Sequence, residues 1–398
     1  MLSLAAIIFW ATVGLMFHSY ILYPRLLRWL ANGKVENQII FDSGDELLPD
    51  VFVIFSAFNE EKVIREKLES IFLSTYPSEK LHVYVGSDNS TDQTNEIVEG
   101  FTHRFSNLTF IPFAERNGKS NVLNSLVKMV QDKGVNPEKD IFILTDANVI
   151  FAPETIYELS KHFKNNSIAQ VGANILNKGV IEDGISFQEK TYIQNENNIK
   201  YYEGLNWGCM IGAFGGCYAL RAGSWKNIPQ NQLMEDFYLS MNVLHQGQKA
   251  IHEKNALCYE DVSSEVGEEF KRKTRIQAGN FQNLAAYWKL LLRFNPVAFC
   301  FLSHKVIRWV GPLLILLAYL SNIFLISQSP FYLFTFILQN LLLQSPLVDY
   351  LLKTIGIHLI VLRFASYFYL MNLALLMGFI LYMRGIKTNS WNPTKRNL

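Results

Sequence analysis

Long apolar stretches without charge occupy the two ends of this chain. Residues 4–24 contain no Asp, Glu, Lys or Arg, and 310–328 and 364–383 are also charge-free. Each is about the 20 residues that an α-helix needs to cross roughly 30 Å of hydrocarbon. Residues 331–352 are apolar but are interrupted by a proline and an aspartate, so they predict either a span or a re-entrant segment. Because the first stretch lacks the basic start and cleavage site of a signal peptide, we expect a permanent anchor.

Between the ends, short apolar runs rich in Val, Ile and Phe alternate with segments of helical periodicity. The runs open the stretches 51–60, 81–94, 108–120 and 140–151. Continuous apolar strands that alternate with helices are typical of an α/β, Rossmann-like domain with a mostly parallel sheet covered on both faces. In such sheets, ligands bind beyond the carboxyl ends of the strands.

The pattern predicts four parts. They are an N-terminal anchor (1–30), a soluble domain (45–290), an interfacial helix (291–309) and a C-terminal membrane region of two or three spans (310–385). The net charge of +1 is too small to suggest nucleic acid as a partner. Four cysteines lack paired metal-ligand spacing, so we assign them packing roles.

Basic residues lie beside the predicted spans, as they do on the cytoplasmic side of membranes. Arg25, Arg28 and Lys34 follow the first span, and a basic run follows residue 270. We therefore expect an integral protein of a bacterial inner (plasma) membrane, with its soluble domain in the cytoplasm. Two later spans would keep the C-terminal basic residues on the cytoplasmic side, whereas hydropathy favours three spans. These basic residues are Arg384, Lys387, Lys395 and Arg396.

Polar side chains gather where the predicted strands end. Asp146 and Asn148 follow the run at 140–145 and carry the oxygen atoms that Mg²⁺ or Mn²⁺ prefers. Asp and Asn are also common in turns and helix caps, so the triplet alone allows both interpretations. Asp88 suits a base or ribose, and Lys119 suits phosphate oxygens, although a solvated turn explains each of these alone equally well.

Two adjacent acids and a glycine-rich stretch are the other candidates. Glu235 and Asp236 stand among apolar residues, where two close carboxylates have coupled titrations and one raised pKa. The alternative is a first helical turn stabilised by acids. The stretch 208–216 is rich in glycine, which allows either a close approach to a ligand or close packing.

The order and spacing of these motifs resemble the membrane-bound family-2 glycosyltransferases with the GT-A fold, which include synthases of cellulose, hyaluronan and poly-N-acetylglucosamine. The resemblance covers roughly residues 50–290. The matching stretches are SAFNEE, VGSDNSTDQT, RNGKSNVLN, LTDANVIF, GGCYALR and MEDFYLSMNVLHQG. The resemblance implies a nucleotide-sugar donor, usually a UDP-sugar, and a Mg²⁺ or Mn²⁺ ion on its diphosphate.

The resemblance also implies roles for single residues. Asp236 would be the general base, supported by Glu235. Asp146 matches the first aspartate of an Asp-x-Asp metal motif, and Asn148 replaces the second, which removes one negative charge. Residues implied for the nucleotide-sugar are Ala57, Asn59, Glu60, Asp88, Lys119, Asp146 and Arg275. Residues implied for the acceptor are Trp207, Gly215 and Gly216.

One departure from the family pattern bears on the product. Many polymerising members carry Gln-x-x-Arg-Trp where this chain has Arg272-Lys-Thr-Arg275-Ile276. The sequence therefore favours addition of a single sugar over processive synthesis, and a basic amphipathic helix on the membrane surface explains the same residues.

The function predicted from sequence is an inverting glycosyltransferase that moves a sugar to a glycan or lipid-linked acceptor at the membrane. Its expected partners are a nucleotide-sugar, that acceptor and membrane lipid. The alternative is a catalytically silent membrane scaffold that binds nucleotide-sugar or glycan.

Overall fold

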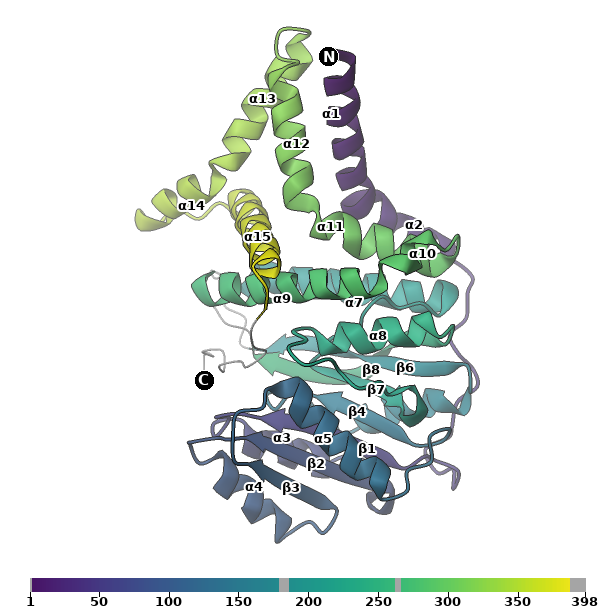
Figure 1. Cartoon of the computed structure of the whole chain (residues 1–398). Helices are drawn as coiled ribbons and strands as arrows, with labels where there is room; N and C mark the ends of the chain where they lie inside the picture. The colour runs from purple at the N-terminus through teal and green to yellow at the C-terminus, as the bar shows by residue number, and fades with distance from the viewer. Residues whose placement is uncertain (1, 179–185, 262–265, 387–398) are drawn as a thin grey trace. The chain divides into compact units, whose positions relative to one another are not determined.

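The computed structural model describes residues 2–178, 186–261 and 266–386 (Figure 1). The chain forms two compact units. The first contains residues 1–29, 181–189 and 264–385, and the second contains 30–180, 190–263 and 386–398. The predicted domain boundaries are not tested by this division and stay a prediction.

The second unit is built on one eight-stranded sheet in the order β3-β2-β1-β4-β7-β6-β8-β5. Parallel pairing joins β1 to β2, β2 to β3, β1 to β4 and β6 to β8, which confirms the predicted mostly parallel sheet. The strands are β1 (Val51–Ala57), β2 (Leu81–Asp88), β3 (Leu108–Phe113), β4 (Ile141–Thr145), β5 (Ile150–Phe151), β6 (Ile168–Lys178), β7 (Cys217–Arg221) and β8 (Lys249–Asp261).

Strand β7 is the exception that shapes the site. It runs antiparallel to both β4 and β6, and Cys217 pairs with Thr145. The first residue of β7 therefore lies beside the last residue of β4. As a result, the glycines that precede β7 reach the same edge of the sheet as the carboxyl end of β4.

Helices cover both faces of this sheet because its strands are apolar on both sides. Every residue of β1 and β4 is buried. Gly86 of β2 faces Val122 of α5, and the residues of β1 and β2 that point the other way form one core cluster with α3, α4 and α6. The helices of this unit are α3 (Ile64–Phe72), α4 (Thr94–Thr102), α5 (Lys119–Asp132), α6 (Thr155–Ser160), α7 (Ser186–Trp207, whose first residues belong to the first unit) and α8 (Glu235–His245).

The four cysteines are free and buried, as their assigned packing roles require. Two of them, Cys217 and Cys258, belong to the same core cluster. Burial raises the pKa of the Cys258 thiol well above its usual range, so this thiol stays neutral and acts as a small apolar side chain.

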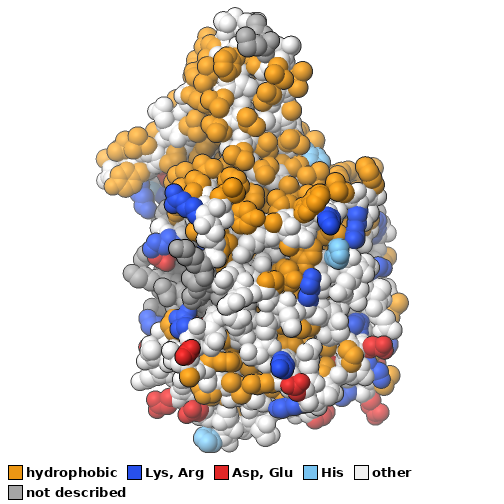
Figure 2. Space-filling view, viewed as in Figure 1, with side chains coloured by type: hydrophobic (Ala, Val, Ile, Leu, Met, Phe, Trp, Pro, Cys, Tyr) orange, Lys and Arg blue, Asp and Glu red, His pale blue; other side chains and the backbone are white. Residues whose placement is uncertain are grey.

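The first unit is helical, and apolar side chains cover much of its surface (Figure 2). Its helices are α1 (Leu2–Phe17), α2 (Tyr23–Leu30, whose last residue belongs to the second unit), α9 (Val266–Tyr287), α10 (Pro296–Cys300), α11 (Ile307–Trp309), α12 (Gly311–Ile323), α13 (Pro330–Leu343), α14 (Ser345–Thr354) and α15 (Ile360–Met383).

Two continuous helices of the described residues, Ser3–Leu30 and Ile360–Met383, are long and apolar enough to cross a membrane. Two bent pairs pass the same test when each pair is taken together. Helices α10–α11 and α12 bend by 65°, and α13 and α14 bend by 47°, close to the proline that interrupts the apolar stretch 331–352. Three of the basic residues that bear on the number of C-terminal spans lie outside the described residues: Lys387, Lys395 and Arg396.

Candidate active site

The loops after β1 and β2 are tied together at the carboxyl edge of the sheet. Asn59 has a φ of 52°, a left-handed conformation that Asn adopts more readily than most residues. Its backbone N–H donates to Ser90 Oγ at 3.1 Å, and its Oδ1 accepts from the N–H of Thr91 at 2.8 Å. Glu60 is buried, and its N–H donates to Thr94 Oγ1 at 2.8 Å. Asn59 and Glu60 therefore hold the two loops in one rigid arrangement.

Asp88, the last residue of β2, organises the next loop. Ala57, the last residue of β1, pairs with its neighbour Ser87, so both strand ends are level. The side chain of Asp88 is fully buried and accepts from the N–H groups of Asn117 (2.6 Å) and Gly118 (3.1 Å). Arg116 Nε donates to the same carboxylate at 3.2 Å. In this structure, Asp88 binds the loop 116–118, and its predicted contact with a base stays a prediction.

Lys119 connects two acidic side chains of different elements. It is the first residue of α5, and its Nζ lies 2.6 Å from Asp146 Oδ1 and 2.5 Å from Glu235 Oε1. Burial lowers the pKa of Lys119, but the carboxylates of Asp146 and Glu235 outweigh burial and raise it above its usual value. Lys119 is therefore a permanent cation at the centre of the edge.

The turn Asp146–Val149 carries the predicted metal ligands. The side chain of Asp146 is 34% exposed, and its second oxygen, Oδ2, has no hydrogen bond or ion pair within the described part of the chain. The N–H of Val149 closes the turn on the Asp146 carbonyl at 3.2 Å. Asn148 is half-buried, and its Nδ2 donates to Glu260 Oε1 at 3.2 Å.

Glu235 and Asp236 open helix α8, and both are buried. Burial raises the pKa of Asp236 to about 7, the negative charge of Glu235 adds to the rise, and Lys119 opposes it. A carboxylate that is partly protonated near neutral pH is matched to proton transfer.

Gly215 and Gly216 lie between Asp146 and Asp236. A Cβ atom at Gly215 would be 2.9 Å from Asp236 Oδ2, so only glycine allows this approach. The carbonyl of Gly216 accepts from the N–H of Asp146 at 3.1 Å and from Thr145 Oγ1 at 2.7 Å. The structure thus brings both predicted glycines to the same edge as Asp146 and Asp236.

Trp207 lies at the opposite edge of the sheet. The carbonyl of its neighbour Gly208 accepts from the N–H of Ala250, near the start of β8. From there, paired strand residues lead across the sheet to the start of β4: Ala250, Gln170, Leu220 and Phe142. Asp146, in contrast, follows the end of β4. Trp207 therefore does not join the other predicted residues, and it has no part in the function proposed below.

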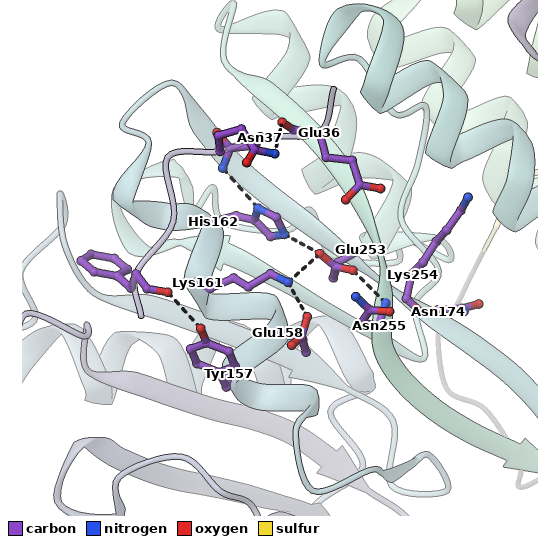
Figure 3. Close-up of polar contacts among 12 residues, drawn as sticks. Glu36, Asn37, Tyr157, Glu158, Lys161, His162, Asn174, Glu253, Lys254 and Asn255 are labelled. Carbon is purple, nitrogen blue, oxygen red and sulfur yellow. Dashed lines mark hydrogen bonds and ion pairs between the residues drawn. The ribbon is translucent and has the colours of Figure 1, made fainter. Parts of the chain in front are cut away.

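Trp207 instead lines a pocket of about 300 Å³ together with Asn37, His162 and Glu253. Figure 3 shows the polar network in its wall: Asn37 Nδ2 lies 3.2 Å from His162 Nδ1, and His162 Nε2 lies 2.6 Å from Glu253 Oε2. Lys161 Nζ lies 3.2 Å from the same oxygen. These contacts fix the segment around Asn37, which follows the predicted anchor, on the second unit.

Arg275 lies on α9, in the first unit, and is exposed. Its neighbour Arg272 pairs with two acids of the same unit, Glu189 Oε1 at 2.6 Å and Glu269 Oε2 at 2.7 Å. The predicted contact of Arg275 with a leaving diphosphate stays a prediction.

Two family models match this chain. The model described as "Glycosyl transferase family group 2" matches residues 141–383, which is more than half of the chain, and "Glycosyl transferase family 2" matches residues 52–225. The chain belongs to the family 2 glycosyltransferases.

Sequence relatives of this glycosyltransferase include two bacterial proteins. The probable glycosyltransferase YdaM of Bacillus subtilis is 38% identical over 81 residues, which is 20% of this chain and 19% of YdaM. The β-monoglucosyldiacylglycerol synthase of Synechocystis is 25% identical over 252 residues, which is 61% of this chain and 50% of that protein. The chain thus matches half or less of the length of these relatives.

A solved structure supports the GT-A fold of this glycosyltransferase. The mannosyltransferase PcManGT from Pyrobaculum calidifontis, solved in complex with GDP-Man and Mn²⁺, superposes with a TM-score of 0.69. The two chains are 19% identical, and the match covers 96% of this chain and 99% of PcManGT. At this identity the similarity concerns the fold, which agrees with the predicted Rossmann-like GT-A domain.

The donor atoms of the site fit a hard divalent cation. Within the described residues, no group of three or more His, Cys, Asp or Glu side chains is placed to hold a metal ion. The two ligands predicted from the sequence are one carboxylate, of Asp146, and one amide, of Asn148. Mg²⁺ and Mn²⁺ fit such a set, because they complete their shell with phosphate oxygens and water.

Two residues of this site carry no signal that sequence reasoning detects. Lys67 of α3 is fully buried under the turn at Asp146, and its Nζ donates to Thr145 Oγ1 at 2.9 Å and to the Val149 carbonyl at 2.5 Å. Burial lowers the pKa of Lys67 to about 8. Glu260 of β8 reaches Asn148 from 112 positions away. Only the pairing of distant elements reveals either contact.

Proposed function

We propose that this glycosyltransferase moves a sugar, with inversion, from a nucleotide-sugar to a lipid-linked or glycan acceptor at the membrane. The observation that carries the proposal is the placement of Lys119. Its ammonium group joins Asp146, a candidate metal ligand, to Glu235, whose neighbour Asp236 has a pKa near 7. One small region therefore holds a cation for a diphosphate and a base for an acceptor hydroxyl.

The donor half of the site consists of the tied loops and Lys119. Asp88 holds the loop 116–118 through hydrogen bonds, and Asn59 holds the neighbouring loop, so both shape the proposed nucleotide site that Ala57 and Glu60 border. Lys119 binds a diphosphate oxygen through its permanent positive charge. Asp146 and Asn148 hold Mg²⁺ or Mn²⁺, which when bound neutralises the negative charge of the leaving nucleoside diphosphate.

The acceptor half consists of Gly215 and Gly216, with the side chain of Asp236 next to Gly215. Asp236 in its ionised form takes the proton of the acceptor hydroxyl, and that oxygen attacks the anomeric carbon on the side opposite the leaving group. One displacement inverts the anomeric carbon and needs no covalent sugar on the protein. Glu235 stays ion-paired to Lys119, which keeps both acidic side chains in position.

Two facts support a lipid-linked acceptor. Two helices of the described residues are long and apolar enough to cross a membrane, and the matched Synechocystis relative is named β-monoglucosyldiacylglycerol synthase. The Gln and Trp positions of the polymerising motif are occupied by Arg272 and Ile276 here, which supports addition of one sugar over polymer synthesis. For the nucleotide, family resemblance favours UDP, whereas PcManGT was solved with GDP-Man.

A donor panel tests the proposal. The full chain in native membranes or nanodiscs is incubated with UDP- and GDP-sugars, an extract of membrane lipids, and Mg²⁺, Mn²⁺ or chelator, and released nucleotide is measured. We expect one nucleotide to be released in a metal-dependent reaction, and Asp236→Asn to reduce its rate by about 10² to 10⁴, the usual contribution of a general base.

The matched control is Glu99→Gln on the exposed surface of α4, which we expect to behave as wild type. Mass spectrometry of the lipid product determines whether one sugar or several are added. An Asp236→Asn variant with wild-type rate would contradict the role of Asp236, and a product with retained anomeric configuration would contradict direct displacement.

A further inference from the structure

Glu260 lies next to the residue at which this chain departs from its family's metal motif. Asn148 Nδ2 donates to Glu260 Oε1 at 3.2 Å. The contact follows from the sheet, because β5 pairs antiparallel with β8 and places Ile150 opposite Tyr259. Val149 and Glu260 flank this pair, and Asn148, the next residue along the turn, contacts Glu260 at the edge that carries the turn at Asp146.

A second observation places the Glu260 carboxylate at the same edge. A Cβ atom at Gly216 would lie 3.2 Å from Val149 Cγ2 and 3.9 Å from Glu260 Oε2. Gly216 also accepts the hydrogen bond from the N–H of Asp146. The carboxylate of Glu260 therefore borders the turn next to Gly216.

The chemistry of an amide makes this contact consequential. Asn148 has one donor group and one acceptor atom, and only the acceptor, Oδ1, binds a cation. When Nδ2 is held by a carboxylate, Oδ1 points away from that carboxylate in a fixed direction. The negative charge of Glu260 also polarises the amide and makes its oxygen a stronger ligand, as outer carboxylates do for metal-bound side chains.

We propose that Glu260 is a positioning residue for the metal–nucleotide site: it orients the amide of Asn148 and supplies the negative charge that an aspartate at position 148 would carry. The inference rests on the proposed function, since it assumes a divalent cation on Asp146 and Asn148. This role explains how the motif can contain an asparagine and still bind a cation, because the carboxylate that replaces the missing charge is hydrogen-bonded to Asn148.

The test measures cation binding without turnover. The full chain in nanodiscs is titrated with Mn²⁺ in the presence of saturating UDP or GDP, and free Mn²⁺ is followed by electron paramagnetic resonance. We expect Glu260→Gln, which keeps the shape and an acceptor oxygen but removes the charge, to weaken Mn²⁺ binding by about 10- to 100-fold. Glu260→Ala, which also frees the amide, should weaken it further.

A double variant separates this role from a general structural one. In Asn148→Asp with Glu260→Gln, the charge returns to position 148 and the glutamine donates to it, so we expect Mn²⁺ affinity close to that of wild type. Asn148→Asp alone places two carboxylates in contact and should lose the hydrogen bond. Thermal unfolding of each variant, with Glu99→Gln as the matched control, shows that the fold is kept.

The outcomes distinguish this inference from the proposed function. If wild type binds no Mn²⁺ with either nucleotide, the proposed metal site fails and the inference falls with it. If wild type binds Mn²⁺ and Glu260→Gln binds it equally well, the inference is overturned while the proposed function stands. A double variant no tighter than Glu260→Gln alone overturns the charge role in the same way.

Discussion

Glu235 and Asp236 are neighbours in the chain but differ in surroundings, and this difference separates their roles. Glu235 forms an ion pair with Lys119 at 2.5 Å, which holds it in place as a counter-charge. Asp236 lies against Gly215, and burial together with the charge of Glu235 raises its pKa to about 7. Only the second carboxylate is therefore suited to exchange a proton near neutral pH.

The pH dependence of the reaction tests this division. A general base works when it is deprotonated, so kcat/KM should rise with pH through the pKa of Asp236, near 7. Glu235→Gln removes a neighbouring negative charge, which lowers that pKa and moves the rise to lower pH. Burial of Asp236 remains, so we expect the pKa to stay above its ordinary value. An unchanged pH profile in Glu235→Gln would contradict the coupling.

At the scale of elements, the site depends on close packing of α5 against β2. Gly86 of β2 faces α5, and a Cβ atom there would lie 2.4 Å from Val122 Cγ1 and 3.2 Å from Leu126 Cδ1. The same helix begins with Lys119 at the site. The position of Lys119 is therefore coupled to the distance between this helix and the sheet.

We expect Gly86→Ala to lower stability by about 1–3 kcal/mol, the usual cost of overpacking a core. The matched control is Gly100→Ala near the end of α4, where a Cβ atom meets nothing within 4 Å and where alanine favours the helix. Thermal unfolding should therefore rank Gly86→Ala below wild type and Gly100→Ala at or above it. Equal unfolding temperatures for the two variants would contradict the packing argument.

At the scale of the whole molecule, the chain combines an α/β unit with a unit of apolar helices. The exposed side chains of α1, α12, α13 and α15 include many Leu, Ile and Phe residues, and burial in lipid would remove this apolar surface from water. The α/β unit has the mixed charged surface of a protein domain in water (Figure 2).

An alkaline carbonate wash of membranes from expressing cells tests this organisation. Such a wash removes proteins held by charge and leaves those held by apolar helices in the membrane pellet. We expect the full chain to stay in the pellet, because at least two helices of the described residues are long enough to span the hydrocarbon layer. Release into the supernatant would contradict a spanning role for these helices.

The sequence by itself determined what depends on local pattern. Buried parallel strands are apolar along their whole length, and membrane helices need about 20 apolar residues, so both are visible in the order of residues. Strand ends of a parallel sheet share one edge, so Asp146 and Lys119 were predictable as neighbours, and the structure brings them together. The role of Asp236 came from the family resemblance and not from a strand end. The bend near Pro346 was predictable for a similar local reason.

Only the tertiary structure decided which distant side chains meet. Trp207 directly precedes the glycine-rich stretch that contains Gly215, yet α7 ends at the opposite edge of the sheet, because side-chain identity does not encode the direction of a neighbouring strand. Lys67 of α3 donates a hydrogen bond to Thr145, 78 positions away, and Glu260 of β8 accepts one from Asn148, 112 positions away. Such contacts depend on strand order and register, which are set by the packing of the whole sheet.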